Sequence, residues 1–483
     1  MNALRRYTLG LALVAAVCGG CATVGPDYHA PAVLGAQAPS IDFDAADPAF
    51  ARATTLPERW WQLYDDPRLD QLVARALAAN ADLRAAAATL DAVRADASAV
   101  AAAAGVHTRV FTPQDGPALS YGQSSTQGLS PSAGAHGKID LAFGIAYELD
   151  VAGRIRRTLE AAAADVGAQA AAYDLARIDL VARVVDAYTG ACSAGARLAV
   201  AKRSVDLQAR SLALTRRGAR AGIYAPLDVA RSEALLAQLR AALEPLAQTR
   251  RRKLYALAVL SGQAPEAFPA DLGECARIPD LHQPLPVGDG AALIRRRPDI
   301  RAAERRLAAA TARIGVATAA LYPTVSLGAS IGTTARLGTH PFSDAATHYS
   351  LGPLVSWTFP NRSVAQARID AAGARAKAAL ARFDATVLNA LQEVEDALSA
   401  YAGHLDQNRQ LRRARDQSER AAQLKERLAR GGTVSPLEAL DVERSLAAAR
   451  SDLAASDAQL ADDRVRIFLA LGGGWAASTP LPR

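Results

Sequence analysis

An internal duplication constrains the fold of this 483-residue chain more than any other feature of its sequence. Several short motifs of the first half recur in register 210 positions later, among them Gly222 as Gly432 and Pro226-Leu227 as Pro436-Leu437. An upstream block, residues 82–86, recurs at 299–303. Two copies are too few for an open repeat array, in which stacked neighbours build the core. We therefore expect each half to supply matching elements to one closed assembly.

Each half contains one very long helical stretch. Residues 154–217 and 363–430 lack proline and keep a helical spacing of apolar side chains. Glycine-containing turns follow, and Pro226 and Pro436 then open return helices at a position where a missing N–H costs little. The sequence thus predicts two matching helical hairpins, at about 154–261 and 363–470. Pro245 lies inside the first return helix, where we expect a kink.

Apolar residues alternate with polar or small ones between the helical blocks. This period of two runs through 139–149, 325–331 and 351–359 and predicts β-hairpins at about 106–150 and 322–360. The apolar face is either a soluble core or a lipid-facing surface. Strands of about 9 to 11 tilted residues span a bilayer, which favours lipid. Four strands per chain are too few to close a barrel, so several chains must share one.

The N-terminus indicates export. Arg5 and Arg6 precede a short apolar run at 9–17, and small residues lead to Cys21, as in a secretory signal that occupies residues 1–20. Cys21 is similar to the lipid-accepting cysteine of bacterial lipoproteins, which carries S-diacylglycerol and N-palmitoyl groups. The alternative is an ordinary cleaved signal and a structural cysteine. Ala22 is not the aspartate typical of inner-membrane retention, so we expect the outer membrane.

Two other cysteines, Cys192 and Cys275, remain in the mature chain. An exported protein permits a disulfide between them. Cysteines in a helical context are more often simply buried, and the sequence favours that interpretation while leaving the pairing open.

Charge and motifs give no indication of an enzyme. The formal charge of +7 comes from arginines mixed with acids along helices, which is typical of solvated faces rather than nucleic-acid binding. The sequence contains no phosphate-binding loop, no nucleophile elbow and no metal-ligand spacing among its seven histidines. We expect no catalytic residue, no metal and no cofactor beyond the lipid.

Short motifs in a fixed order resemble one family. They are Val24-Gly25-Pro26-Asp27-Tyr28, Trp60-Trp61, Asp65-Asp66-Pro67, Asn80 with Asp82-Leu83, Arg313-Ile314-Gly315-Val316-Ala317, Tyr322-Pro323 and Leu471-Gly472-Gly473-Gly474-Trp475. This series resembles the outer-membrane efflux family, and in particular its NodT-type lipoprotein branch. The resemblance implies a mainly α protein with a membrane β part, a TolC-like homotrimer. Four strands per chain would form a shared 12-stranded β-barrel, continued by a long periplasmic α-helical tunnel.

The resemblance also implies a function and partners. Such proteins are the outer-membrane exit duct of a tripartite efflux pump, lipid-anchored in the Gram-negative outer membrane. They passively conduct drugs and toxic small molecules, and they dock a periplasmic adaptor and a resistance-nodulation-division pump. One alternative is a TolC-like duct for type I protein secretion. Another is a periplasmic adaptor lipoprotein, against which the four membrane-type strands and the duplication both argue.

Candidate site residues lie at the hairpin tips. Leu437 and Asp441 match the pair that narrows the periplasmic mouth in the lipoprotein branch, and their spacing puts both on one helical face. The alternative is a packed leucine and a solvated aspartate. Arg231 stands at the first-copy position of Asp441, where a contact between the two would latch the mouth. Adaptor contacts are expected at four tip glycines, which otherwise only terminate helices: Gly218, Gly222, Gly431 and Gly432.

These expectations divide the chain into six parts. A lipidated and equatorial segment (21–70) follows the signal at 1–20. The first repeat (71–262) and the second (291–472) flank an equatorial connector at 263–290, and a tail of residues 473–483 ends the chain.

Overall fold

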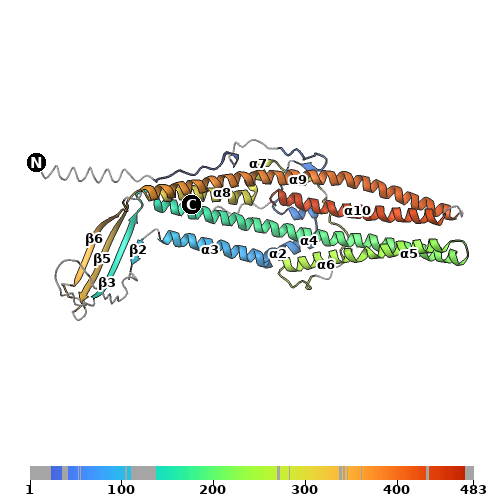
Figure 1. The fold of residues 1–483 in the computed structure, drawn as a ribbon, viewed down its shortest axis with the longest axis horizontal. Helices are drawn as coiled ribbons and strands as arrows, with labels where there is room; N and C mark the ends of the chain where they lie inside the picture. Colours follow the sequence, from blue (N-terminus) through green and yellow to red (C-terminus); the bar gives the residue numbers. More distant parts are fainter. Residues whose placement is uncertain are drawn as a thin grey trace. The chain divides into compact units, whose positions relative to one another are not determined.

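We analysed a computed structural model of the chain (Figure 1). The residues it describes are 23–34, 42–52, 54, 56–103, 106–109, 138–268, 272, 274–281, 283–336, 340, 343–344, 346–359, 362–430 and 435–473. The predicted signal peptide, Cys21, Gly431 and Gly432 lie outside these residues. The fold divides into two compact units, which are considered separately: unit 1 comprises Met1–Ala30, Leu90–Gln169 and Ala303–Phe383, and unit 2 the remainder.

Unit 1 contains a four-stranded antiparallel sheet in the order β2-β3-β5-β6. The strands are β2 (Val106–Arg109), β3 (Lys138–Leu149), β5 (Thr324–Arg336) and β6 (Thr347–Ser356). Figure 1 shows β3, β5 and β6 side by side. β3 comes from the first repeat and β5 from the second, and their pairing joins the two copies at the centre of the sheet.

The two faces of this sheet differ in chemistry. Side chains of one face of β3 are exposed and apolar, with Phe143 46% and Tyr147 47% exposed, and Leu351 of β6 is 80% exposed. The opposite face carries small residues that pair across strands, such as Ala146 with Gly328. Alternation in the sequence predicted both faces. β6 ends at Ser356, so the exposed Trp357 and Phe359 follow the strand rather than extend it.

The helices follow the duplicated pattern. They are α2 (Pro67–Ala79), α3 (Ala81–Ala103), α4 (Arg154–Arg220), α5 (Pro226–Ala241), α6 (Leu243–Leu260), α7 (Gly290–Arg296), α8 (Pro298–Ala319), α9 (Arg362–Arg430) and α10 (Pro436–Ala470). The two long helices have 67 and 69 residues. Because an α-helix rises about 1.5 Å per residue, each of these helices is about 100 Å long. Each is followed by its return helix, as predicted. None of the helices in the described ranges is both long and apolar enough to cross a membrane.

The expected kink near Pro245 is confirmed. The first return helix is broken at Ala242 into α5 and α6, and Pro245 lies in the first turn of α6. A proline there loses no helical hydrogen bond, since the first N–H groups of a helix have no partner. Its counterpart Ala455 lies inside the unbroken α10.

In the core of unit 2, aromatic residues that precede α2 pack against α9 and α10. The Trp60 ring, fully buried in a short 3-10 helix (η2, Trp60–Tyr64), stacks on Phe468 of α10 with centroids 4.5 Å apart. Phe50 meets Tyr401 of α9 edge-on at 5.3 Å. Burial of these rings ties residues 42–64 to the second repeat.

Two consecutive arginines fix the end of α10. Arg297 donates a hydrogen bond to the carbonyl of Ala470 (2.8 Å), and Arg296 donates one to that of Leu471 (3.0 Å). Cations are favourable at a helix C-terminus, where carbonyls lack partners. Arg297 also pairs with Asp299 of α8 (2.7 Å) and Glu393 of α9 (2.8 Å), so one buried guanidinium joins α8, α9 and α10.

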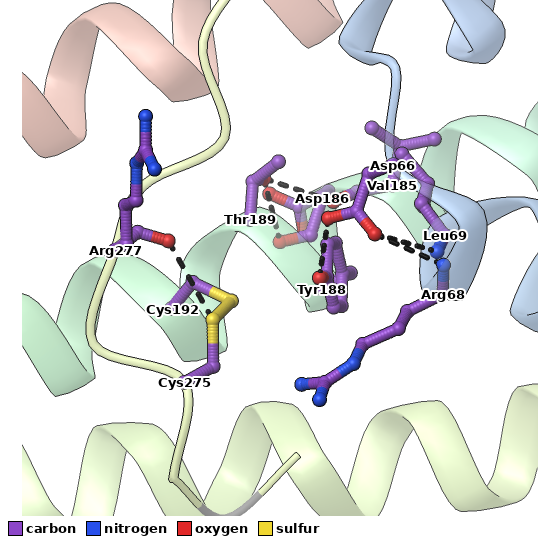
Figure 2. The surroundings of a disulfide bond; sticks show 10 residues. All are labelled: Asp66, Arg68, Leu69, Val185, Asp186, Tyr188, Thr189, Cys192, Cys275 and Arg277. Atoms are coloured by element: carbon purple, nitrogen blue, oxygen red, sulfur yellow. Dashed lines mark hydrogen bonds between the residues drawn. A yellow bond between two sulfur atoms is a disulfide. The ribbon is translucent and has the colours of Figure 1, made fainter. Parts of the chain in front are cut away.

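Cys192 and Cys275 form a disulfide, with Cα atoms 4.8 Å apart (Figure 2). The interpretation of two separately buried cysteines is therefore wrong. The physical reason is Gly195, less than one turn along α4: a Cβ there would lie 2.0 Å from the carbonyl oxygen of Cys275. The absence of a side chain lets the connector approach α4 closely enough for the sulfurs to bond.

The same stretch of α4 holds the start of α2. The Tyr188 hydroxyl donates to the Asp66 carboxylate (2.6 Å), and Asp66 also caps α2 by accepting from the N–H groups of Arg68 and Leu69 (Figure 2). The connector that contains Cys275 and the start of α2 are thus both held to α4, at positions about one helical turn apart.

Candidate functional site

The first hairpin tip requires glycine for two different reasons. Gly222 has φ +75°, a left-handed conformation that side chains resist. A Cβ at Gly218 would lie 2.5 Å from the Tyr224 ring. The Ile223 N–H donates to the Gly218 carbonyl (2.9 Å) and closes the turn. Both predicted glycines therefore have a structural role, and the exposed Ile223 (72%) stands beside them.

The second tip begins with a complete capping box. The Ser435 hydroxyl accepts from the Glu438 N–H (3.2 Å), and the Glu438 carboxylate accepts from the Ser435 N–H (3.0 Å). The Ser435 N–H and the Ser435 hydroxyl (3.0 Å each) both donate to the Glu438 carboxylate, and these two hydrogen bonds lower the pKa of Glu438. In the first copy, Asp228 accepts from the Ala225 N–H (3.1 Å), so both return helices begin alike.

The candidate gate residues are exposed one turn apart on α10. Leu437 is 56% exposed, close to the 57% of its counterpart Leu227 on α5. Asp441 is exposed as well, and so is Arg231 at the matched position of α5. Within the described part of the chain, no ion pair joins Arg231 to Asp441. The predicted latch contact between these two residues is therefore not formed within this single chain.

In each hairpin, a glutamate of the return helix instead forms an ion pair with the long helix. The two glutamates occupy matching positions of the duplication. Glu233 of α5 pairs with Arg216 of α4 (2.6 Å), and its counterpart Glu443 of α10 pairs with Lys425 of α9 (2.8 Å). Ser211 of α4 also donates to Glu443 (2.9 Å), which links the two hairpins. The recurrence of Glu233 as Glu443 was the only sequence signal for these contacts.

A groove of about 490 Å³ lies beside this link. It is bounded by α4 on one side and by α9 and α10 on the other, and the Lys425–Glu443 pair forms part of its wall. Both side chains of this pair are largely buried, 16% and 21% exposed, so the pair is less screened than a surface ion pair.

The motif Val24 to Tyr28 is fixed within unit 1, and we call residues 23–28 the strap. The Arg157 side chain, 4% exposed, donates to the Val24 carbonyl (3.2 Å) and to Asp27 (2.6 Å). That hydrogen bond and the guanidinium charge lower the pKa of Asp27. Gly25 has φ +87°, and a Cβ on it would lie 2.4 Å from the Cα of Gly315.

The strap continues to a buried contact with the second repeat. The Tyr28 hydroxyl donates to Glu304 of α8 (2.5 Å), and burial raises the pKa of that hydroxyl. Since Arg157 belongs to α4 and Gly315 and Glu304 to α8, the strap touches both repeats within unit 1. The motif Val24 to Tyr28 therefore attaches the N-terminal segment to α4 and α8.

The structure places no group of His, Cys, Asp or Glu, among the residues it describes, that could hold a metal ion. The described candidate residues that the sequence predicted lie on the surface or in turns. They can pack, steer ions and bind partners.

A duplicated chain with two long helical hairpins and an antiparallel sheet exposing one apolar face defines a class: the subunits of outer-membrane channels. The comparisons with known proteins give the family. The chain matches the outer membrane efflux protein family over residues 72–263 and 291–473, and it belongs to that family.

Relatives support the NodT-type branch. The chain is 30% identical to the antibiotic efflux pump outer membrane protein ArpC of Pseudomonas putida, covering 99% of this chain and 97% of the relative. It is 29% identical to nodulation protein T of Rhizobium leguminosarum bv. viciae, over 98% and 95%. The solved outer-membrane channel OprN is 38% identical, with a TM-score of 0.84 over 94% of this chain and all of that one. The predicted fold class and family are confirmed.

Proposed function

We propose that this chain is the exit duct of a tripartite efflux pump in the Gram-negative outer membrane. The observation that carries the proposal is the sheet of unit 1: its exposed apolar face suits lipid, its small-residue face suits a lumen, and four strands cannot close alone. Three chains would complete one barrel of 12 strands, with β2 and β6 meeting the neighbours. ArpC, named as an efflux pump component, supports this assignment.

The strap supports a lipid anchor at Cys21. It begins two residues after this cysteine, and it contacts Arg157 of α4 and Gly315 of α8. We propose S-diacylglycerol and N-palmitoyl groups on Cys21. The test is metabolic labelling with a palmitate analogue, which Cys21→Ser abolishes if the proposal is correct.

A periplasmic adaptor and a resistance-nodulation-division pump are the proposed partners. We assign adaptor docking to the tips around Gly218, Gly222, Gly431 and Gly432. The exposed Ile223 offers an apolar contact beside the first two of them. Energy would come from the pump, and the cargo would be small toxic compounds, as the name of ArpC suggests for that relative.

The proposed gate is Leu437 with Asp441. Threefold repetition would place three exposed leucines and three carboxylates around the mouth, an apolar constriction next to a cation-attracting ring. We predict that Leu437→Ala with Asp441→Ala raises the open probability in planar bilayers and reduces the preference for cations. Leu227→Ala is the matched control, because that leucine is equally exposed on the other hairpin.

Unchanged conductance, ion selectivity and open probability in the double variant would exclude these residues as a gate. Arg231→Ala tests the latch separately. If Arg231 of one subunit contacts Asp441 of another, this variant also opens the channel more often, and wild-type behaviour would contradict the latch.

A further inference from the structure

A basic groove lies between α8 and the beginning of α9 in unit 1. Its volume is about 770 Å³. Three arginines line it: Arg313 from α8, and Arg368 and Arg375 from α9. The rest of its wall is small or apolar, and includes Val316, Ala317, Val364, Ala367 and Ala371. No acidic residue is among the described residues that line it.

Two of the three positive charges in this groove have no ion-pair partner among the described residues. Arg313 is paired with Asp165 of α4 and is still 53% exposed. Arg368 and Arg375 are exposed, and the described residues include no ion-pair partner for either. Their seven-residue spacing, nearly two helical turns, puts both on the same side of α9. The groove thus presents an excess of positive charge beside apolar surface.

The duplication shows that this charge is specific to the second repeat. At the first-copy positions, Arg375 corresponds to Asp165, Arg368 to Thr158 and Arg313 to Asp96. A general preference for arginine on solvated helical faces would put basic residues at both copies. Here two of the three positions have the opposite charge in the first copy, so the groove is a local feature.

The groove and the strap lie on different sides of α8. The strap packs on Gly315, whereas Arg313, Val316 and Ala317 line the groove. At about 100° per residue, these three are rotated about 100° to 200° from Gly315 around the helix axis. With the lipid proposed above on Cys21, the strap lies on the outside of the proposed assembly. On that assignment the groove faces inward, toward the lumen of the proposed duct.

We propose that this groove is a transit site for anionic organic compounds, those carrying a carboxylate, sulfonate or phosphate group on an apolar body. Guanidinium groups bind such anions in bidentate fashion and attract them from solution. The valine and alanine wall accommodates the apolar body. Three symmetric copies would form a basic ring in the lumen. This inference rests on the proposed function as a duct.

The test is equilibrium binding of pyranine, a trisulfonated pyrene dye, to the detergent-solubilised protein by fluorescence anisotropy at low salt. We expect Arg368→Gln with Arg375→Gln to weaken binding about fivefold or more, because two of the three cations are lost. Lys377→Gln removes an exposed charge from another side of α9 and is the matched control, with affinity unchanged within about twofold. The cationic dye rhodamine 6G should show no binding above background to either the wild type or the double variant.

Equal pyranine affinity in the wild type and the double variant would overturn the proposal. So would an equal loss in Lys377→Gln, which would mean binding to net charge alone. A change in the oligomeric mass of the double variant would assign the arginines to a contact between subunits instead. Conductance in planar bilayers, measured on the same samples, distinguishes failure of this site from failure of the duct itself.

Discussion

Removal of the disulfide is the perturbation whose magnitude follows most directly from the structure. Cys192 and Cys275 are separated by 83 positions, so the bond closes a long loop in the unfolded chain. The chain-entropy relation gives a stabilisation of about 4 to 5 kcal/mol for a loop of this length. Replacing Cys192→Ala with Cys275→Ala should lower the free energy of unfolding by about that amount. Alanine suits the fully buried site of Cys192, because it introduces no unpaired polar group.

The assay is guanidinium unfolding of the purified protein in detergent, followed by the helical circular dichroism signal. We expect a lower midpoint for the double variant. Dithiothreitol should shift the wild type to the same midpoint and leave the variant unaffected, which is the internal control. Alkylation of both cysteines in unreduced wild-type protein, or identical midpoints in all samples, would refute the reasoning.

Three further predictions concern the strap and the end of α10. Gly25→Ala should speed amide exchange across residues 23–28, since the positive φ and the 2.4 Å approach to Gly315 leave no room for a Cβ, and unchanged exchange would contradict this. Arg157 lowers the pKa of Asp27, so the Arg157–Asp27 contact should be retained at the ordinary aspartate value of pH 3.8 and be lost only as the pH falls through the lowered pKa; the pH dependence of amide exchange in residues 23–28 measures this. Arg297→Ala should destabilise the protein by about 2 to 3 kcal/mol in the same guanidinium assay, with Arg297→Lys intermediate.

Local sequence signals predicted most of the fold. The proline-free stretches and the prolines after the turns predicted both hairpins, and alternation predicted β3 and β5. The kink near Pro245 followed from the geometry of proline alone. These features depend on neighbours in the chain, which is why a single sequence suffices to predict them.

Features that depend on tertiary approach were harder to predict. The disulfide required the close contact at Gly195, and no spacing in the sequence indicates that Cys275 lies there. The link from Ser211 to Glu443 joins residues of different repeats. The Arg231–Asp441 latch was inferred from matched positions, which say nothing about distance. The first strand, β2, has a weak alternating pattern in the sequence, and its described residues are Val106–Arg109.

Single-channel conductance of the purified protein in planar bilayers, together with its mass in detergent, tests the central claim most directly. The account predicts a trimer that inserts and gives discrete conducting events, whose open probability rises when Leu437 and Asp441 are replaced. A monomer that inserts no channel would contradict the exit duct and favour the adaptor alternative.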